Sequence, residues 1–174
     1  MKIVVFSDVH GRSYRVEQVL ALHPNADAVL FLGDGIRDLP DSVYRGAWSF
    51  AGVRGNCDLF GAGNSDFPFF SELTLNLESY TVMMMHGDAY GVKHGTEDAI
   101  CHAVERGADL LLYGHTHAPE ERYLPEGTII GNKTLAKPLW IMNPGSLGAP
   151  RDGVPTYGLV QIRNKQILLS HGTV

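Results

Sequence analysis

The sequence contains little cysteine and no long apolar segment. Its two cysteines, Cys57 and Cys101, are too few among 174 residues for a disulfide framework, and neither lies in a Cys-x-x-Cys or Cys/His zinc pattern. We therefore expect a reducing, cytoplasmic compartment. The N-terminal apolar run, which ends before Asp8, is far too short for a signal peptide or a membrane span.

Positive charge is also scarce, and no run of basic residues occurs. The formal net charge is −5 and the sequence pI is about 5.9. Neither long nucleic acid nor an anionic membrane is an expected partner, because both are held mainly by clustered positive charge. Positive charge at a functional site must then come from a bound group. The composition leaves a homo-oligomer open.

The chain does have enough apolar residues for one core. With 174 residues and 44% hydrophobic composition, it has the size of one well-buried domain. No internal repeat, low-complexity tract or linker interrupts it. We expect a single domain spanning residues 1–174.

The apolar pattern predicts strands separated by helices in the first half and hairpins in the second. Strands are expected over residues 2–7, 28–32, 48–53, 72–77, 80–85, 109–113, 139–143, 157–162 and 166–170. One helix should follow the first strand and end at His23-Pro24, and another should span residues 95–106. This order favours an α/β protein with either one mixed sheet or two packed sheets.

Polar side chains beside glycines follow five of these strands. They are two carboxylates, one amide and four imidazoles, from Asp8, Asp34, Asn56, His10, His86, His115 and His117. Polar groups gather at the carboxyl edge of such sheets, and all seven are metal ligands by type. Seven ligands are too many for one tetrahedral zinc, but suit two metals of higher coordination if a carboxylate bridges them. Asp34, between two glycines, is the expected bridge.

Charge counting indicates what such a site would bind. Two divalent ions bring about four positive charges, and two carboxylates with a bridging hydroxide remove about three of them. The remaining charge matches a phosphodiester monoanion. The imidazole-rich ligand set favours Mn²⁺, Fe²⁺, Co²⁺, Ni²⁺ or Zn²⁺ over Ca²⁺ or Mg²⁺. Two such ions suit attack on phosphorus by a hydroxide that bridges them, so the sequence predicts phosphoester hydrolysis.

These blocks, in this order, resemble the calcineurin-like metallophosphoesterases over residues 8–117. The short chain, the GNCD block at residues 55–58 and the tail at residues 143–147 resemble the small bacterial and archaeal YfcE-type phosphodiesterases. The resemblance implies a four-layer α/β/β/α sandwich of two mixed β-sheets flanked by helices, with manganese as the common ion and a small phosphodiester as substrate. It also implies two ligand sets that share Asp34: Asp8, His10, Asp34 and His117 for one ion, and Asp34, Asn56, His86 and His115 for the other.

The GNCD block departs from most of that superfamily, in which a histidine follows the asparagine and acts on the leaving group or the phosphate. Cys57 stands there instead, and a thiol with an ordinary pKa near 8.5 is a poor acid. We therefore assign Asp58 to proton transfer or to orienting a ligand histidine, and interpret Cys57 as a small, partly buried residue. Proton transfer by Asp58 predicts that Asp58→Asn harms alkyl diesters more than nitrophenyl diesters.

Other roles follow from position along the chain. Asn56 and His86 are expected to act in catalysis beside Asp58. Arg12 and Arg54, with Asn56, are expected to contact the substrate because they lie next to motif loops. Arg151 lies near a motif loop as well, and Asp88 replaces a histidine that relatives often have. The turn at residues 143–146 shapes either the pocket edge or only the local backbone.

Two other functions stay open. Phosphomonoesterase or protein phosphatase activity would need more positive charge for a dianionic ester, and the chain is too short for large capping insertions. A non-catalytic protein-interaction scaffold, like the retromer subunit of this fold, is the alternative from another class. That relative has lost part of the ligand set, whereas all four ligand histidines remain here, which favours catalysis.

Overall fold

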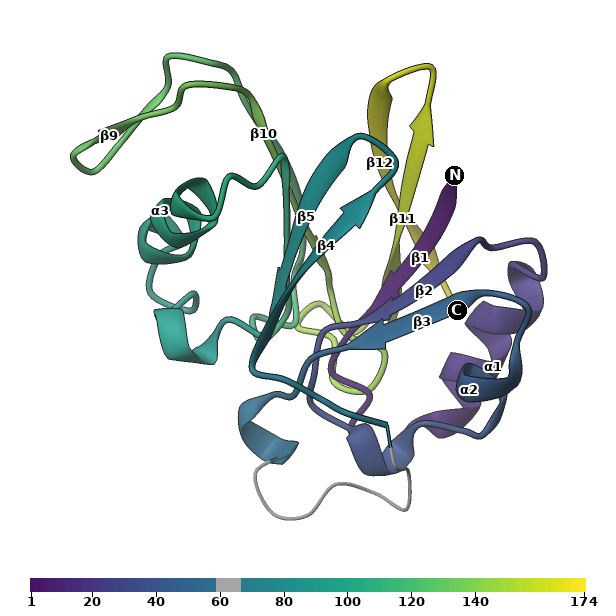
Figure 1. Ribbon diagram of the computed structural model, residues 1–174. Helices are drawn as coiled ribbons and strands as arrows, with labels where there is room; N and C mark the ends of the chain where they lie inside the picture. The colour runs from purple at the N-terminus through teal and green to yellow at the C-terminus, as the bar shows by residue number, and fades with distance from the viewer. Residues whose placement is uncertain (59–66) are drawn as a thin grey trace.

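The computed structural model describes residues 1–58 and 67–174. Two five-stranded sheets face each other, with helices on their outer faces (Figure 1). The first sheet has the order β12-β11-β1-β2-β3, and the second has the order β4-β5-β6-β10-β7. Both sheets are mixed. Parallel pairs join β1 to β2 and β2 to β3 in the first sheet, and β5 to β6 and β6 to β10 in the second.

The elements have the following bounds. The first sheet contains β1 (Lys2–Phe6), β2 (Ala28–Phe31), β3 (Ser49–Gly52), β11 (Thr156–Arg163) and β12 (Gln166–Thr173). The second contains β4 (Glu72–Leu77), β5 (Tyr80–Met85), β6 (Leu110–Tyr113), β7 (Pro119–Leu124) and β10 (Leu139–Pro144). A small hairpin pairs β8 (Ile129–Ile130) with β9 (Lys133–Thr134). The α-helices are α1 (Ser13–Leu22), α2 (Ser42–Arg45) and α3 (Glu97–Glu105), and the 3-10 helices are η1 (Ile36–Asp38), η2 (Asn56–Asp58) and η3 (Asp88–Tyr90).

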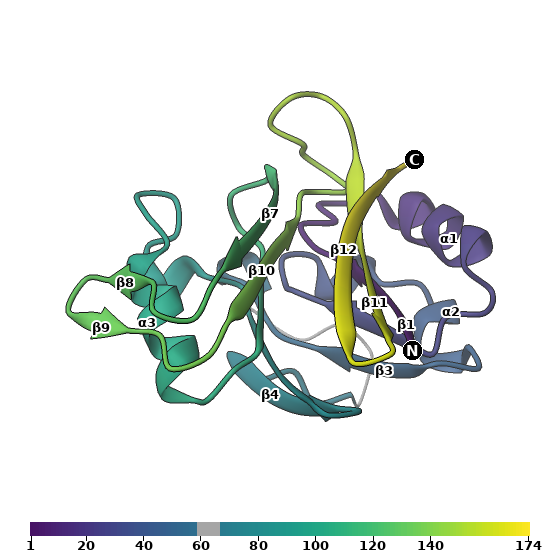
Figure 2. The same ribbon diagram turned by 90° about the horizontal axis from the view of Figure 1, so that it is seen from above.

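Alternation along the buried strands produces four layers. In β1, Ile3 and Val5 point into the core between the sheets, whereas Val4 and Phe6 pack in the cluster that includes the apolar residues of α1. In β5, Met84 joins the core between the sheets, and its neighbours join the cluster that includes α3. Successive residues of a strand face opposite sides, so a strand buried on both faces needs a continuous apolar run. The α/β/β/α arrangement is therefore confirmed (Figure 2).

The predicted strands are found within three residues of their expected ends, the largest difference being at the end of β12. The sequence pattern missed β7, the β8–β9 hairpin and α2. β7 has the sequence PEERYL and lies at the edge of its sheet, where only one face is covered and charge is tolerated. Its sequence therefore lacks an apolar run. Within the described ranges, no helix is long and apolar enough to cross a membrane.

Candidate metal centre

The loops after five parallel strands supply the polar residues that the sequence singled out. Asp8 and His10 follow β1, Asp34 follows β2, Asn56 follows β3, His86 follows β5, and His115 and His117 follow β6. Six of these residues form two groups whose donor atoms lie within 4.8 Å of one another: Asp8, His10 and His117, and then Asp34, His86 and His115. The two sheets thus bring their carboxyl ends together at one cluster. These groups comprise only histidine, cysteine and acidic side chains, so they say nothing of Asn56, and the ligand role of all seven residues stays a prediction.

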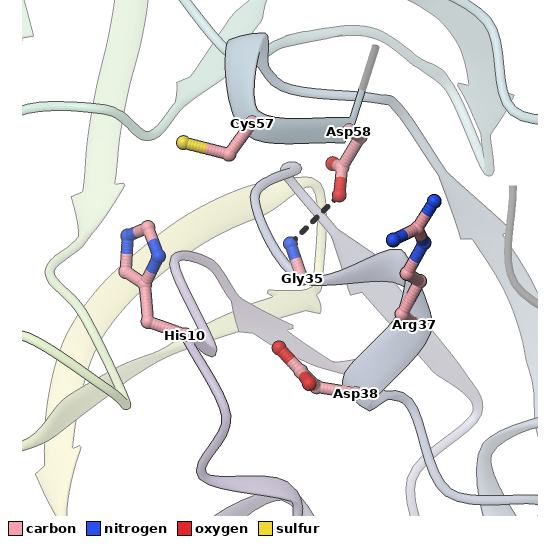
Figure 3. Close-up of a pocket in the computed structure, with 6 residues that line it drawn as sticks. All are labelled: His10, Gly35, Arg37, Asp38, Cys57 and Asp58. Carbon is pink, nitrogen blue, oxygen red and sulfur yellow. Dashed lines mark hydrogen bonds between the residues drawn. The ribbon is translucent and has the colours of Figure 1, made fainter. Parts of the chain in front are cut away.

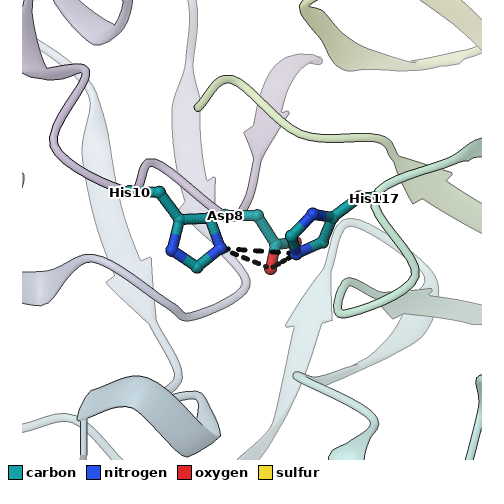
Figure 4. A group of neighbouring side chains, drawn as sticks. All are labelled: Asp8, His10 and His117. Atoms are coloured by element: carbon teal, nitrogen blue, oxygen red, sulfur yellow. Dashed lines mark hydrogen bonds and ion pairs between the residues drawn. The ribbon is translucent and has the colours of Figure 1, made fainter. Parts of the chain in front are cut away.

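In the first group, one carboxylate oxygen and two imidazole nitrogens lie close together. Asp8 Oδ1 lies 3.1 Å from His117 Nε2, and that nitrogen lies 3.3 Å from His10 Nε2 (Figure 4). His117 Nδ1 lies 2.7 Å from the Ala149 carbonyl oxygen, which can only accept, so Nδ1 carries the proton and Nε2 a lone pair. Asp8 Oδ1 is buried and accepts no hydrogen bond. Facing lone pairs around a buried, unpaired oxygen fit a bound cation.

In the second group, a carboxylate oxygen and two imidazole nitrogens again lie close together. His86 Nε2 lies 3.3 Å from Asp34 Oδ2 and 3.1 Å from His115 Nδ1. His86 Nδ1 donates to the Leu32 carbonyl at 2.8 Å, which fixes the tautomer and leaves Nε2 as a ligand atom. The groups adjoin, because the second oxygen of Asp8 accepts the backbone N–H of His115 at 3.1 Å. Two neighbouring cation sites therefore fit this donor set.

Five members of the cluster have a backbone conformation that L-amino acids rarely adopt. Their φ angles are positive, at 54° for Asp8, 40° for His10, 60° for Asp34, 68° for His115 and 58° for His117. The other non-glycine residues with positive φ in the described ranges lie in the β4–β5 and β11–β12 turns. Such conformations cost energy and cluster at functional sites, where the surrounding structure holds them.

Glycines in the motifs let the loops approach closely. A Cβ on Gly55 would lie 2.1 Å from Asp34 Oδ1, and one on Gly114 would lie 2.2 Å from Ser7 Oγ. Real Cβ atoms do not come so close, so any larger residue would separate the loops. The glycine before Asn56 thus makes room for the Asp34 carboxylate.

The carboxylates and imidazoles of the cluster shift one another's pKa values. Burial alone would raise the pKa of Asp8, but the hydrogen bonds that His10 and His117 donate when they are protonated outweigh burial and hold that pKa well below its usual range. Burial also acts to raise the pKa of Asp34, but the hydrogen bond and the charge of His86 outweigh burial and lower that pKa to about 2. In return, the hydrogen bond with Asp8 raises the pKa of His10. His86 is also shifted upward: burial lowers its pKa, but the Asp34 and Asp8 carboxylates outweigh burial. Both carboxylates are therefore ionised at neutral pH.

Asp58 does not have the environment of a proton carrier. Its Oδ2 accepts the backbone N–H groups of Asp34 at 2.8 Å and Gly55 at 2.9 Å, and its Oδ1 accepts those of Gly35 at 2.9 Å and Ile36 at 3.0 Å. Figure 3 shows the carboxylate directed at the Gly35 amide. A carboxylate has about four acceptor sites, so all are used. Asp58 thus joins two loops and holds the Asp34 backbone rather than a ligand histidine, while its assignment to proton transfer stays a prediction.

Cys57 and Asn56 lie at the exposed side of the cluster. The Cys57 N–H donates to Asp34 Oδ1 at 2.8 Å, and the Asn56 amide donates to Cys57 Sγ at 3.5 Å. Cys57 is exposed, not partly buried as expected, and carries a free thiol. Partial desolvation, and then the nearby charge of Asp34, raise the pKa of Cys57 to about 11. A thiol with such a pKa does not replace the missing histidine as an acid.

The sequence left the role of the turn at residues 143–146 open, and the structure gives residues 143–149 a positioning role. Ser146 Oγ donates to the Asp8 carbonyl at 2.8 Å, and Asn143 Nδ2 donates to the Gly114 carbonyl at 2.8 Å. The segment also supplies the carbonyl that orients His117. It therefore ties the loop after β1 to the loop after β6. The signal available in the sequence was the polar nature of Asn143 and Ser146. Both side chains are fully buried in the structure, and a buried polar side chain needs hydrogen-bond partners.

Two cavities border the cluster. One, of about 150 Å³, is lined by His10, Gly35, Arg37, Asp38, Cys57 and Asp58 (Figure 3). The other, of about 260 Å³, is lined by Lys93, Thr116, His117 and Arg151. The expected substrate contacts Arg12 and Arg54 line neither cavity in the described part of the chain. The cationic side chains that line these cavities belong to Arg37, Lys93 and Arg151. They come from the loops after β2, β5 and β10, which lie closer to the cluster than their positions in the sequence suggested.

The comparison with protein families decides the relationship. The model of the calcineurin-like phosphoesterase superfamily domain matches residues 1–165. The chain belongs to this superfamily. The family expected from the motif order is thus confirmed, and with it the general class of phosphoric ester hydrolases.

Relatives and solved structures agree. A probable metallophosphoesterase, YsnB of Bacillus subtilis (strain 168), is 28% identical over 94% of this chain and 86% of its own length. Phosphodiesterase YfcE of Escherichia coli (strain K12) is 27% identical over 92% of this chain and 87% of its own. A Streptococcus pneumoniae TIGR4 protein, described as a predicted phosphoesterase, has a structure with a TM-score of 0.74 and 28% identity, covering 99% of this chain and 88% of that one. Vps29 of Entamoeba histolytica, complexed with Zn²⁺, shares the fold with a TM-score of 0.69 and 17% identity over 99% of each chain.

Proposed function

We propose that the chain, acting as one domain, is a metal-dependent phosphodiesterase that hydrolyses a small phosphodiester. The observation that carries the proposal is the pair of adjoining donor groups, in which carboxylate oxygens and imidazole nitrogens lie within 4.8 Å of one another and the buried Asp8 Oδ1 has no hydrogen bond. The superfamily membership and the phosphodiesterase relative support the same reaction class.

Two divalent transition-metal ions would fill these groups. Asp8, His10 and His117 would hold one ion, and His86, His115 and Asn56 the other, with Asp34 shared between them. The imidazole content favours Mn²⁺, with Fe²⁺, Ni²⁺, Co²⁺ or Zn²⁺ as alternatives. When bound, such ions supply Lewis acidity that activates water and stabilises charge on phosphoryl oxygens.

The chain's own residues hold this donor set in place. Asp8 and Asp34 provide negative charge in a buried setting, and the Leu32 and Ala149 carbonyls hold His86 and His117 with Nε2 directed inward. Asp58 holds the backbone at Asp34 through its hydrogen bonds. With no acid in place of the missing histidine, good leaving groups should be cleaved far better than alkyl ones, because general acid catalysis typically contributes about 10²–10⁴-fold.

The test is an assay of metal-stripped protein on bis-p-nitrophenyl phosphate with and without Mn²⁺. The assay is repeated on Asp34→Asn and on the control Asp41→Asn, which changes an exposed carboxylate just before α2 that is paired with Arg45. We expect turnover that depends on Mn²⁺, is lost in Asp34→Asn and is kept in Asp41→Asn, with metal content measured in parallel.

Other results would point to other functions. Faster turnover of p-nitrophenyl phosphate than of the diester would indicate a phosphomonoesterase. A folded protein that turns over neither ester with any of the five metals would favour a protein-interaction scaffold.

A further inference from the structure

The cavity lined by Lys93, Thr116, His117 and Arg151, here called the cationic cavity, adjoins the metal centre. His117 belongs both to this cavity and to the first donor group, so a molecule bound at the metals would extend toward it. With a volume of about 260 Å³, the cavity has room for one small substituent rather than for a macromolecule.

The two cations of this cavity are exposed and available. Among the ion pairs of residues 1–58 and 67–174, none involves Lys93 or Arg151, although the chain carries a net charge of −5. Two cations of the described residues therefore lie beside His117, a member of the first donor group.

The cavity wall is held by the same segment that positions the metal centre. The backbone N–H of Arg151 donates to the His117 carbonyl at 3.0 Å, which fixes the arginine backbone relative to a ligand histidine. Thr116 Oγ1 accepts a hydrogen bond from Asn143 Nδ2 at 3.0 Å. The cations thus extend from anchored backbone beside the reacting centre.

We propose that the cationic cavity binds an anionic oxygen group, a phosphate or a carboxylate, that the substrate carries in addition to its scissile phosphodiester. Guanidinium and ammonium groups bind such anions through charge-assisted hydrogen bonds, and a guanidinium can do so with two parallel bonds. This inference rests on the proposed function and narrows the substrate class to small diesters with a second anionic centre. A diester with two uncharged arms would leave both cations without a partner.

The first experiment compares three diesters that share a p-nitrophenyl leaving group. Their second arms are propyl, 2-carboxyethyl and 2-phosphoethyl, so the first two have the same number of carbons and differ by a carboxylate charge. We expect kcat/KM for a charged arm to exceed that for propyl by about tenfold, mainly through KM, as one charge-assisted hydrogen bond provides. The better of the two charged arms identifies the anion.

Variants assign the effect to residues. In Lys93→Gln and in Arg151→Gln the ratio of charged to propyl substrate should fall toward one. Arg163→Gln is the matched control, because Arg163 is exposed at the far end of β11, where that strand pairs with the start of β1. A ratio near one in the wild type, or a ratio that survives both cavity variants, would overturn the inference while leaving the phosphodiesterase proposal intact.

A binding measurement decides the inference even if no diester is hydrolysed. Calorimetric titration of the protein in Mn²⁺ buffer compares propylphosphonate with 3-phosphonopropionate, which adds a terminal carboxylate to a similar chain. We expect about tenfold tighter binding of 3-phosphonopropionate in the wild type and in Arg163→Gln, and no such difference in Arg151→Gln. Equal dissociation constants in the wild type would reject the cationic cavity as an anion site.

Discussion

Asp58 illustrates how one side chain can support a site without touching the reacting atoms. Its two oxygens accept four N–H groups from the loops after β2 and β3. In Asp58→Asn one oxygen remains, and an amide nitrogen faces the N–H groups of Asp34 and Gly55. Buried donors left without acceptors cost about 1–3 kcal/mol each. We expect weaker metal binding and equal loss of kcat/KM on nitrophenyl and alkyl diesters.

This expectation replaces the earlier, sequence-based one. A role in proton transfer predicts a much larger loss on alkyl diesters, since their leaving groups need a proton. The control is Asp41→Asn, which changes an exposed carboxylate just before α2. A selective loss on alkyl esters in Asp58→Asn would restore Asp58 as the acid.

The same cluster predicts how metal binding depends on pH. Imidazole binds a metal only when the ligand nitrogen is unprotonated. In the metal-free protein, hydrogen bonding to Asp8 raises the pKa of His10, and the carboxylates raise that of His86 against the effect of burial. Protons therefore compete with the metal at a higher pH than at a free histidine, whose pKa is 6.5. As the pH is lowered, the metal content after dialysis should begin to fall before the pH reaches 6.5. Equal metal content at about pH 5 and pH 8 would contradict this ligand set.

At the scale of elements, residues 143–149 connect loops of the two sheets through hydrogen bonds. Ser146 Oγ donates to the Asp8 carbonyl and accepts the N–H groups of Gly148 and Ala149. Ser146→Ala removes these hydrogen bonds, and the Ala149 N–H loses its acceptor, whereas the Asp8 carbonyl and the Gly148 N–H keep the 2.8 Å bond between them. The free energy of unfolding should fall by about 1–3 kcal/mol. Because Ala149 orients His117, metal affinity should fall as well.

Urea unfolding and metal titration test this prediction. Ser170→Ala is the matched control, since Ser170 is exposed on β12. Lost stability with unchanged metal affinity would show that the segment supports the fold without positioning the ligands.

At the scale of the whole molecule, the metal centre lies where the two sheets meet, so bound metal should stabilise the complete fold. A ligand that binds only the folded state adds about 3 kcal/mol at a free concentration of about 100 times its Kd. We expect the Tm to fall on treatment with EDTA, to recover with Mn²⁺, and to respond little in Asp34→Asn. An equal Mn²⁺ effect on wild type and variant would indicate binding elsewhere.

The sequence by itself determined the elements and the inventory of donors. An alternating apolar pattern indicates a strand with one covered face, and a continuous apolar run indicates a strand with two. Because these patterns are local, the ends of β1, β2 and β5 were predicted within about two residues. The motif order was also sufficient for the family. β7 was not predictable in this way, because an edge strand can be charged.

Only the tertiary structure decided which donors face each other and what supports them. His10 and His117 are separated by 107 positions yet have nitrogens 3.3 Å apart, and His86 is oriented by the carbonyl of Leu32, 54 positions away. The fourfold acceptor role of Asp58 and the meeting of Lys93 with Arg151 are of the same kind. These contacts follow from how two sheets pack face to face, and no local pattern of residues records the distance between loops on different sheets.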